Sequence, residues 1–239
     1  MGIYPSGDDI RAVHVGPSPI AAVYAGSQLV WSSTPPPLAV QMGATSYLPF
    51  TTGAEDLGAN PQAWSVLVSD GIAGGVLSRY TVNASPPSLP VPNAGPVTLT
   101  GWVQIVGTGS SATAVLKITA SNFVLQARIV PNSRNLWWDR RHGATAQQTV
   151  NVGVIPTGWV FVAAVMEPVS GTTWRFRHYI NGVEKGNITW DAGTQSEPTS
   201  PTMAANVGNS IFNADDFAIY PVALTATQVS TLYQAGRST

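Results

Sequence analysis

The hydrophobic and polar positions of this chain alternate over long stretches. In the segment 97–105, apolar side chains share one face of the expected strand, and Trp102 lies with polar side chains on the other. The segments 123–130 and 174–180 repeat this two-residue period. Such a period is typical of β-strands that pack one face against a core. The pattern therefore predicts a protein built mainly from strands.

One segment departs from this alternation. Residues 159–166 are apolar at every position, which predicts a central strand that is covered on both faces. The pair Asn181-Gly182 follows the strand expected at 174–180. This pair favours a tight hairpin, because both turn positions of a type I′ turn need positive φ. Strands joined by Gly- and Pro-rich turns predict an all-β, two-sheet antiparallel sandwich.

A single helix is expected near the end of the chain. Thr225 is suited to the N-cap position, and Gln228 stands three residues later, as in a capping box. Gly236 is suited to end the helix. The apolar stripe expected between these ends consists of Val229, Leu232 and Tyr233. We expect this short helix to lie across an edge or end of the sandwich.

The first part of the chain carries a ten-residue repeat, in which residues 10–19 resemble residues 20–29. Each unit predicts a short strand that ends in a glycine turn. Three consecutive prolines follow within residues 32–38 and favour a stiff, extended spacer. We therefore predict a small β element at 1–34, a Pro-rich linker at 35–38 and one large domain at 39–239. The alternative interpretation is that the proline segment is a loop within one domain.

The composition points to an uncharged surface. Of the 239 residues, 44% are hydrophobic and only 10% are charged, against about 25% charged in a typical soluble domain. A surface of neutral polar groups loses little solvation when a neighbouring subunit covers it. We therefore expect an assembly, most simply a homo-oligomer. A monomer with an uncharged surface is the alternative.

Several classes of function are disfavoured. The net charge is −1, and no basic cluster exceeds Arg140-Arg141, so nucleic-acid binding is not expected. The absence of cysteine excludes disulfides, thiolate metal sites and cysteine nucleophiles. The first residues lack the pattern of a signal peptide, and the apolar run at 159–166 is far shorter than the roughly 20 residues of a membrane helix. We expect synthesis in the cytoplasm and no membrane insertion.

The order of the predicted elements resembles the laminin-G-like/concanavalin-type family. The longest matching block contains an Asp-Asp strand, the sequence Ile-Tyr and the terminal helix with Leu-Tyr-Gln-Ala-Gly. The resemblance covers roughly residues 97–237, and its matching blocks are 97–103, 158–163, 179–183 and 214–236. It implies a jelly roll of two curved antiparallel sheets, with the helix after the last strand.

The N-terminal repeat is similar to segments in minor tail proteins of actinobacterial phages. The similar positions run from Val13-His-Val-Gly16 through Val23-Tyr-Ala-Gly-Ser27 to Val30-Trp31. This second resemblance implies a virion protein whose N-terminal element docks to the particle. The side chains expected to dock are Val13, Val15, Val23, Tyr24 and Trp31.

The segment 135–142 is the best candidate for a recognition patch. An aromatic ring can stack on the apolar face of a sugar, while Asp and Arg bind its hydroxyls. Strand alternation places Trp137 and Trp138 on opposite faces, so one of them should belong to the core. The candidate ligand-binding residues are Trp137, Trp138, Asp139, Arg140 and Arg141, together with Trp102. Core packing with a subunit contact and glycan binding both remain open for this segment.

The acidic residues do not suggest catalysis. A glucanase of related fold needs closely spaced carboxylates on one strand, and no such spacing occurs here. In some members of the family, acids near Asp215 and Asp216 help to hold Ca²⁺, with Asp56 and Asp70 as the conceivable partners. The alternative is that one Asp caps a turn or pairs with an arginine while the other is solvated. No other cofactor is expected.

These observations favour a structural, adhesive virion protein over an enzyme. The leading hypothesis is a phage minor tail protein that touches a cell-envelope glycan and contacts other virion proteins. The second hypothesis is a capsid decoration protein. The third is a polysaccharide-degrading enzyme, which the missing carboxylate spacing disfavours.

Overall fold

The structure is a computed structural model of the whole chain. It describes residues 13–15, 18–20, 22–25, 28–32, 38–44, 46–48, 72–73, 76–78, 82–84, 95–120, 123–142, 147–191, 204–207 and 211–236. Among these residues, no helix has the length and apolar character needed to cross a membrane.

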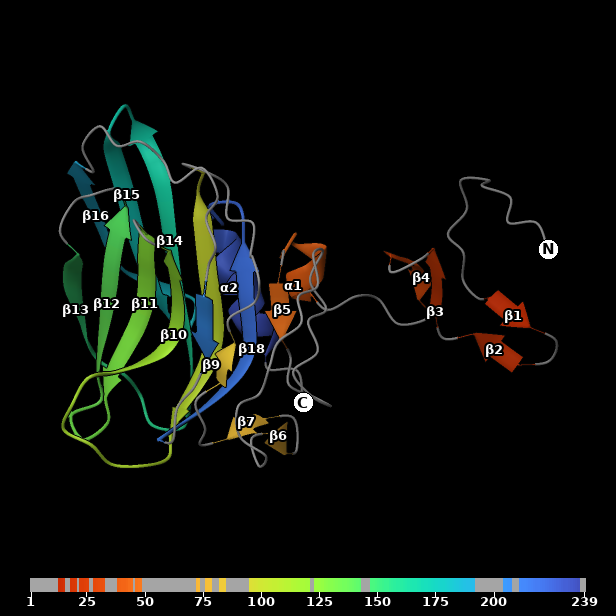
Figure 1. Cartoon of the computed structure of the whole chain (residues 1–239), viewed down its shortest axis with the longest axis horizontal. Helices are drawn as coiled ribbons and strands as arrows, with labels where there is room; N and C mark the ends of the chain where they lie inside the picture. The colour runs from red at the N-terminus through yellow and green to blue at the C-terminus, as the bar shows by residue number, and fades with distance from the viewer. Residues whose placement is uncertain are drawn as a thin grey trace.

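Two antiparallel sheets form the body of the protein, as Figure 1 shows. The first sheet has the order β13-β12-β11-β10-β17-β8. Its strands are β8 Val82–Ala84, β10 Thr113–Ala120, β11 Phe123–Val130, β12 Asn135–His142, β13 Gln148–Val154 and β17 Ala204–Val207. We call it the six-stranded sheet.

The second sheet has the order β16-β15-β14-β9-β18-β7-β6, and β5 also pairs with β18. We call it the central sheet, because it has layers on both sides. Its strands are β5 Ser46–Leu48, β6 Ile72–Ala73, β7 Val76–Ser78, β9 Val97–Ile105, β14 Trp159–Ser170, β15 Thr173–Ile180, β16 Val183–Asp191 and β18 Phe212–Tyr220. The two sheets confirm the predicted sandwich.

The main core lies between the two sheets. Trp138 and Leu125 reach into it from the six-stranded sheet, and Val162 and Phe176 reach into it from the central sheet. All four side chains are buried. Burial of a large apolar side chain contributes about 1.5–3 kcal/mol, so this core is the main source of stability.

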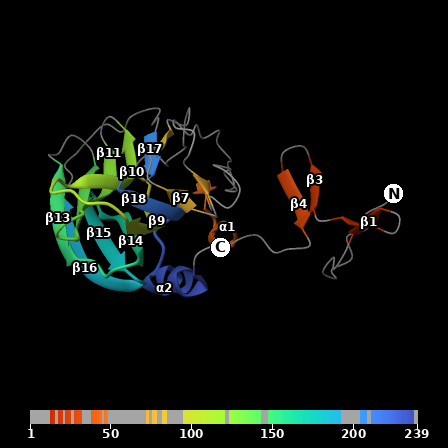
Figure 2. The same cartoon turned by 90° about the horizontal axis from the view of Figure 1, so that it is seen from below.

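A second apolar layer covers the other face of the central sheet. Two helices, α1 Leu38–Gln41 and α2 Ala226–Ala235, lie on this side, and Figure 2 shows α2 alongside the strands. Buried members of this layer include Phe161, Val165 and Tyr179. The prediction that 159–166 is a strand covered on both faces is therefore confirmed.

This second layer corrects one expectation. The alternation at 97–105 suggested that Trp102 lies on a polar face, but only 8% of Trp102 is exposed, and Thr98 and Thr100 beside it are also buried. The Trp102 ring packs edge-on against Phe161, with 5.4 Å between the ring centroids. The predicted two-residue alternation of this strand is correct, but the second face of the strand packs against the helices instead of facing solvent.

The terminal helix forms as the sequence predicts. The Thr225 hydroxyl accepts a hydrogen bond from the Gln228 backbone, and the Gln228 side chain accepts one from the Thr225 backbone, which completes the capping box. Val229 and Leu232 are buried against the central sheet. Gly236 ends the helix with φ of 79°.

The N-terminal repeat folds as two short hairpins. In the first, β1 Val13–Val15 pairs with β2 Ser18–Ile20, and in the second, β3 Ala22–Ala25 pairs with β4 Gln28–Ser32. Each hairpin is a separate two-stranded sheet, drawn in red away from the sandwich in Figure 1. The backbone thus agrees with a strand in each repeat unit, whereas the predicted glycine turns lie outside the described residues.

The predicted domain boundary falls beside α1. Leu38, assigned above to the linker, starts this helix and is partly buried against the second apolar layer. The division into 1–34, 35–38 and 39–239 otherwise stays a prediction, because residues 33–37 lie outside the described part of the chain.

The Asn181-Gly182 turn joins β15 to β16 and packs against the terminal helix. Asn181 and Gly182 have φ of 49° and 74°, as a type I′ turn requires. A Cβ added to Gly182 would lie 3.0 Å from the Tyr233 side chain and 3.2 Å from Ser230 Cα. The glycine therefore allows both the turn and the close approach of α2.

We predict that Gly182→Ala destabilises the protein by more than Gly171→Ala. Gly171 also has a positive φ, of 50°, but an added Cβ there meets nothing within 4 Å, so it serves as a matched control. A left-handed non-glycine residue costs about 1 kcal/mol or more at either position. Chemical unfolding of both variants measures the difference. Equal losses would show that α2 does not constrain the turn.

Candidate functional site

Strand β12 divides the predicted recognition residues between two faces. Leu136, Trp138 and Arg140 point toward the core between the sheets. Trp137 and Asp139 lie on the outer face of the six-stranded sheet, where alternation also places Arg141. The prediction that one of the two tryptophans belongs to the core is confirmed, because Trp138 has no exposed surface.

Asp139 is the centre of the outer-face group. Arg128 of β11 donates from Nη2 to Asp139 Oδ1 at 2.7 Å, and Arg128 Nε lies 2.6 Å from Oδ2. The Thr149 hydroxyl of β13 donates to Oδ1 at 2.7 Å, and the Gln126 amide donates to Oδ2. Three strands thus contribute to one buried carboxylate. Neighbouring strands bring these residues together, because Gln126 and Thr149 stand opposite Asp139 in the two ladders.

This network fixes the charge of Asp139. Burial by itself raises the pKa of this carboxyl. The hydrogen bonds from Arg128, Thr149 and Gln126, together with the nearby Arg128 charge, lower the pKa by more than burial raises it. The net pKa lies below the ordinary value of 3.8. Asp139 is therefore an ionised, fully engaged acceptor at neutral pH. A group in this state positions its partners and is unsuited to act as a proton donor.

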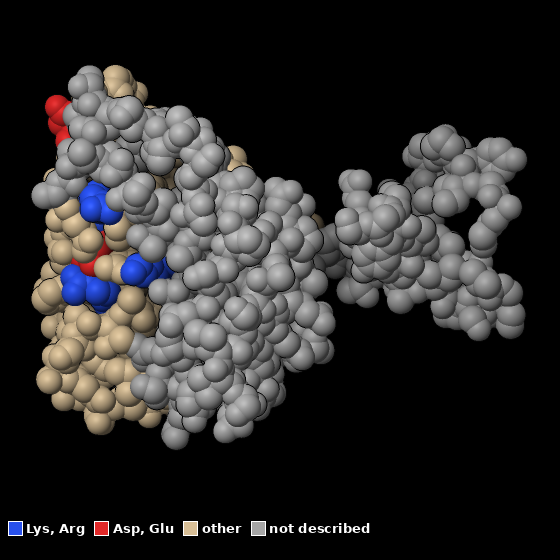
Figure 3. Space-filling view, in the orientation of Figure 1, with Lys and Arg blue, Asp and Glu red and all other residues tan. Residues whose placement is uncertain are grey.

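Basic and aromatic groups surround the carboxylate. The Arg128 guanidinium lies over the Trp137 ring, 5.5 Å from the centroid. Trp137 is partly exposed, and its buried Nε1 finds no hydrogen-bond partner in the described part of the chain. Lys117 and Arg141, which are also partly exposed, stand in neighbouring rows of the same face. Figure 3 shows this face, with basic side chains gathered around an acidic one.

We define the outer-face cluster as Lys117, Arg128, Trp137, Asp139 and Arg141. Its three basic groups and one carboxylate leave a surplus of two positive charges. The whole chain has 11 Lys and Arg residues and a net charge of −1. Among the described residues, the cluster therefore has more basic than acidic groups. It has the composition to bind an anion that also carries an apolar face.

Arg140 serves a different purpose on the inner side. It is 3% exposed, and its guanidinium lies 4.9 Å from the Trp190 ring centroid and 5.2 Å from that of Phe176. Its Nη2 donates to Gln148 at 2.7 Å, whereas Nε and Nη1 have no hydrogen-bond partner among the described residues. Two aromatic faces therefore hold this cation, and Arg140 does not share a surface with Trp137.

His178 lies beside this buried cation. It is 3% exposed and packs on Phe176 with 5.5 Å between the ring centroids. Burial first, and then the Arg140 charge, lower the pKa of His178 to about 4. His178 is thus neutral at physiological pH.

The Asp215-Asp216 pair lies in a β-bulge of β18. Register places Asp215 opposite Trp102 and Ala218 opposite Thr100, so Asp216 and Phe217 together oppose Gly101. Asp215 is buried and accepts a hydrogen bond from the Asp216 backbone at 2.9 Å. Asp216, with φ of 48°, accepts one from the Tyr47 hydroxyl at 2.6 Å. Within the described residues, no group of three or more His, Asp or Glu side chains is suited to hold a metal.

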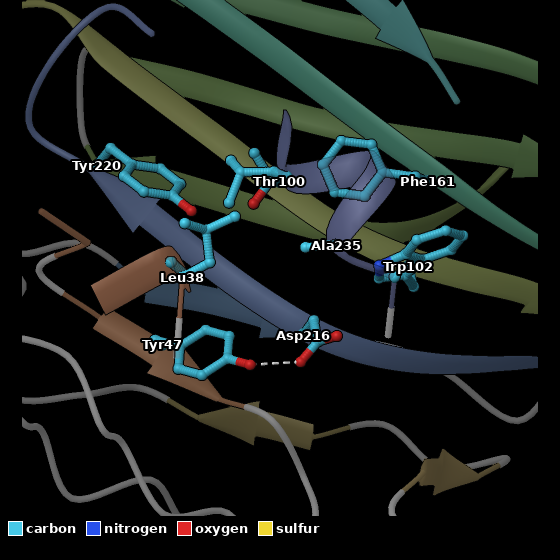
Figure 4. A pocket seen from close by; sticks show the side chains of 11 residues that line it. Leu38, Tyr47, Thr100, Trp102, Phe161, Asp216, Tyr220 and Ala235 are labelled. Carbon is cyan, nitrogen blue, oxygen red and sulfur yellow. Dashed lines mark hydrogen bonds between the residues drawn. The ribbon is translucent and has the colours of Figure 1, made fainter. Parts of the chain in front are cut away.

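Trp102 and Asp216 line the same pocket, between the central sheet and the two helices. Figure 4 shows this pocket, which is remote from the outer-face cluster because it lies on the other side of the sandwich. The expected Ca²⁺ partners Asp56 and Asp70 lie outside the described residues.

The predicted docking residues are placed by their backbone alone. Val13 and Val15 are in β1, Val23 and Tyr24 are in β3, and Trp31 is in β4. In the second hairpin, Val23 stands opposite Trp31. The side chains of all five lie outside the described part of the structure, so their role in docking stays a prediction.

Sequence reasoning did not identify Arg128 and Lys117. Both stand on strands that precede β12, and only the register of the sheet brings them to Asp139 and Trp137. One signal was available, because Gln126 and Arg128 are the two polar positions of an otherwise apolar segment at 123–130. Polar positions on a strand beside a Trp-Asp strand indicate a shared outer face.

Residues 78–230 match the family model described as the concanavalin A-like lectin/glucanases superfamily. The match covers well over half of the chain and agrees with the family resemblance seen in the sequence. A comparison with curated proteins found no match.

Solved structures with a similar fold include three botulinum neurotoxin binding domains. The serotype G binding domain has a TM-score of 0.62 at 14% identity over 80% of this chain and 51% of its own. The serotype D binding domain gives 0.60 at 15% over 82% and 52%, and the DC binding domain in complex with SialylT gives 0.61 at 15% over 82% and 52%. This chain thus spans about half the length of these neighbours. At such low identity the likeness shows the fold alone.

We predict that the protein loses stability as the pH falls from about 6.5 to about 4, through His178. Its folded pKa of about 4 lies below the ordinary value of 6.5, so the unfolded state takes up the proton first. Neutral His178 therefore makes its full contribution to stability above pH 6.5. On acidification to about pH 4, the free energy of unfolding falls by on the order of 3 kcal/mol. Urea unfolding across this range measures it.

The variant His178→Gln, which does not titrate, isolates this effect from the other histidines. It should be less stable than the wild type at pH 8, but its stability should change less between pH 6.5 and 4. An identical pH dependence in both proteins would contradict the assignment of a buried neutral His178.

Proposed function

We propose that this chain, which belongs to the concanavalin A-like lectin/glucanases superfamily, is a binding protein without catalytic activity that recognises an anionic polysaccharide of a cell envelope. The observation that carries this proposal is the outer-face cluster. It combines a partly exposed tryptophan with a surplus of positive charge on the face of a regular sheet.

The chemistry of the cluster suits an acidic sugar. An indole ring packs on the apolar C–H face of a sugar ring, and arginine and lysine side chains bind its carboxylate or phosphate groups. Lys117, Arg128 and Arg141 stand on three adjacent strands, which lie about 5 Å apart. Cations spread over three strands can meet separate charges along one polymer chain. A neutral glycan would gain nothing from this surplus of charge.

The same geometry supports binding over hydrolysis. A glycosidase needs one carboxylic acid that holds a proton and a second carboxylate about 5–9.5 Å away. Asp139 has a lowered pKa and is occupied by Arg128, Thr149 and Gln126. Among the described residues of this face, Asp139 is the one acidic group. We therefore assign Asp139 to holding Arg128 in place.

We further propose that the protein works on a phage virion, as a minor tail protein. The support is the N-terminal repeat, which resembles phage tail segments and forms two hairpins separate from the sandwich. Two-stranded hairpins are marginally stable alone and gain stability against a partner. On this proposal residues 1–34 dock to other virion proteins, and the jelly roll faces the host cell.

The solved neighbours fit a role in attachment. They are binding domains of toxins, and two of them are described as complexes, one with SialylT and the other with rat synaptotagmin II. The jelly roll is therefore a scaffold that other proteins use within receptor-binding domains. For this chain, the position of the site rests on the outer-face cluster itself.

We predict that the double variant Lys117→Gln, Arg141→Gln weakens binding to polygalacturonate by about tenfold. Each exposed charge contact contributes about 0.2–1 kcal/mol, and 1.4 kcal/mol corresponds to a factor of ten. The affinity of the wild type should also fall as salt is added, because salt screens exposed charges. Titration calorimetry with polygalacturonate, and with neutral dextran as the uncharged control, measures both effects.

Lys185→Gln is the matched control, because Lys185 is exposed on β16 of the other sheet. It should bind polygalacturonate as the wild type does. If dextran binds as tightly as polygalacturonate, or if the control loses as much affinity as the double variant, the proposed site is wrong. Release of reducing ends from either polymer would contradict the binding-only function.

We predict that removal of residues 1–37 abolishes incorporation into particles but leaves the jelly roll folded. Leu38 is retained because α1 packs against the second apolar layer. Phage particles grown with the truncated protein, examined by quantitative mass spectrometry, report its incorporation. A few copies per particle for the full chain would indicate the tail, and hundreds would indicate the capsid. Normal incorporation of the truncated protein would refute the docking role.

A further inference from the structure

The pocket between the central sheet and the two helices has features that the proposed polysaccharide site does not use. Its volume is about 230 Å³, and its walls come from α1, β5, β9, β14, β18 and α2. A dry apolar cavity of about 150 Å³ is already large enough for benzene. This pocket is therefore sized for one compact group of a ligand and not for a polymer.

Aromatic rings form much of its wall. Figure 4 shows Tyr47, Trp102, Phe161 and Tyr220 around the hollow, with Asp216 at its edge. These rings come from four different strands, so the fold assembles them from positions far apart in the sequence. The negative faces of aromatic rings attract cations, most strongly when water is excluded.

Two further features favour positive charge. Asp216 is the one charged side chain among the described residues that line the pocket, and its carboxylate accepts the Tyr47 hydroxyl hydrogen bond at 2.6 Å. Ala235 and Gly236 place the C-terminal end of α2 at the rim, and its last turn contains no basic residue. The C-terminal end of a helix carries partial negative charge, which attracts cations.

The bulge in β18 determines which of its side chains face the pocket. Asp216 has a left-handed φ of 48°, and the extra residue there changes which side chains of β18 face the helices. Tyr220, four residues later, has no exposed surface. Its hydroxyl is buried near Thr100, and it makes no hydrogen bond of good geometry within the described part of the chain.

From this geometry we propose that the pocket binds a trimethylammonium group, held by the rings of Tyr47, Trp102 and Phe161 and by the Asp216 carboxylate. The methyl groups match the apolar wall, and the positive charge matches the ring faces, the carboxylate and the helix end. Choline esters and trimethylated lysine side chains both present this group. The site is distinct from the outer-face cluster, which favours anions.

The test is protein-detected NMR on the full chain, with choline and its uncharged carbon isostere 3,3-dimethyl-1-butanol as probes. The two probes have nearly the same shape, so their difference in affinity reports the charge. Choline should shift the amide signals of Ala235 and Gly236 in a saturable way, and bind about tenfold more tightly than the isostere. Phosphocholine and trimethyl-lysine then show which source of the group is preferred.

Asp216→Asn is the matched variant, because an amide oxygen can still accept the Tyr47 hydrogen bond. It should reduce choline affinity about tenfold and leave the affinity for the isostere unchanged. Asp191→Asn, at an exposed position of β16, should change neither. Equal affinity for the two probes, or no saturable shift at Ala235 and Gly236, would overturn the proposal. Polygalacturonate binding by Asp216→Asn should be normal, so failure here is separable from failure of the outer-face site.

Discussion

The burial of both faces of the central sheet is the constraint on which the rest of the structure depends. On β14, Val160, Val162 and Met166 pack toward the six-stranded sheet, while Phe161 and Val165 pack toward the helices. A strand of this composition is stable only if apolar layers cover both of its sides. The terminal helix and α1 supply the second layer. The helices occupy one side of the sandwich, and the outer face of the six-stranded sheet carries regular rows of partly exposed side chains, among them Arg128 and Trp137.

This arrangement also explains how a weakly charged chain uses its ionisable groups. Asp139 is a buried carboxylate that orders Arg128 on the outer face. Arg140 is a buried cation that aromatic rings hold on the inner face. A buried carboxylate is tolerated when it is paired and hydrogen-bonded, and a buried guanidinium when rings stack on it. Asp139 and Arg140 are adjacent on one strand, yet the carboxylate is stabilised by hydrogen-bond donors on one face and the guanidinium by aromatic rings on the other.

The two proposed sites prefer ligands of opposite charge, and at each site the preference arises from the charged groups that the fold brings together there. On the outer face, the cations outnumber the carboxylate, whereas in the pocket Asp216 and the end of α2 make the environment negative. Each preference arises from local geometry, since the net charge of the chain is close to zero.

Much of the fold was predictable from the sequence. The period at 97–105 and 123–130, the apolar run at 159–166 and the capping box at Thr225 are local signals, and each formed the element that it predicts. The family resemblance added the order of the layers. These features are encoded within short segments, so no knowledge of distant partners was needed.

The candidate sites were harder to predict because they depend on register and on the third layer. Trp102 looks like a residue of a polar face until a helix 130 residues later covers it. Arg140 looks like a surface residue until Phe176 and Trp190 are known to face it. Lys117 and Arg128 join Trp137 only through the pairing of β10, β11 and β12. A one-residue shift in that pairing would place them on the opposite face.

Hydroxyl-radical footprinting of the full chain, with and without saturating polygalacturonate, tests the central claim most directly. Trp137 and Trp159 are both partly exposed, but they lie on different sheets, so Trp159 is an internal control. The polymer should protect Trp137 from oxidation and leave Trp159 unchanged. Unchanged oxidation of Trp137, or protection confined to Trp159, would contradict it.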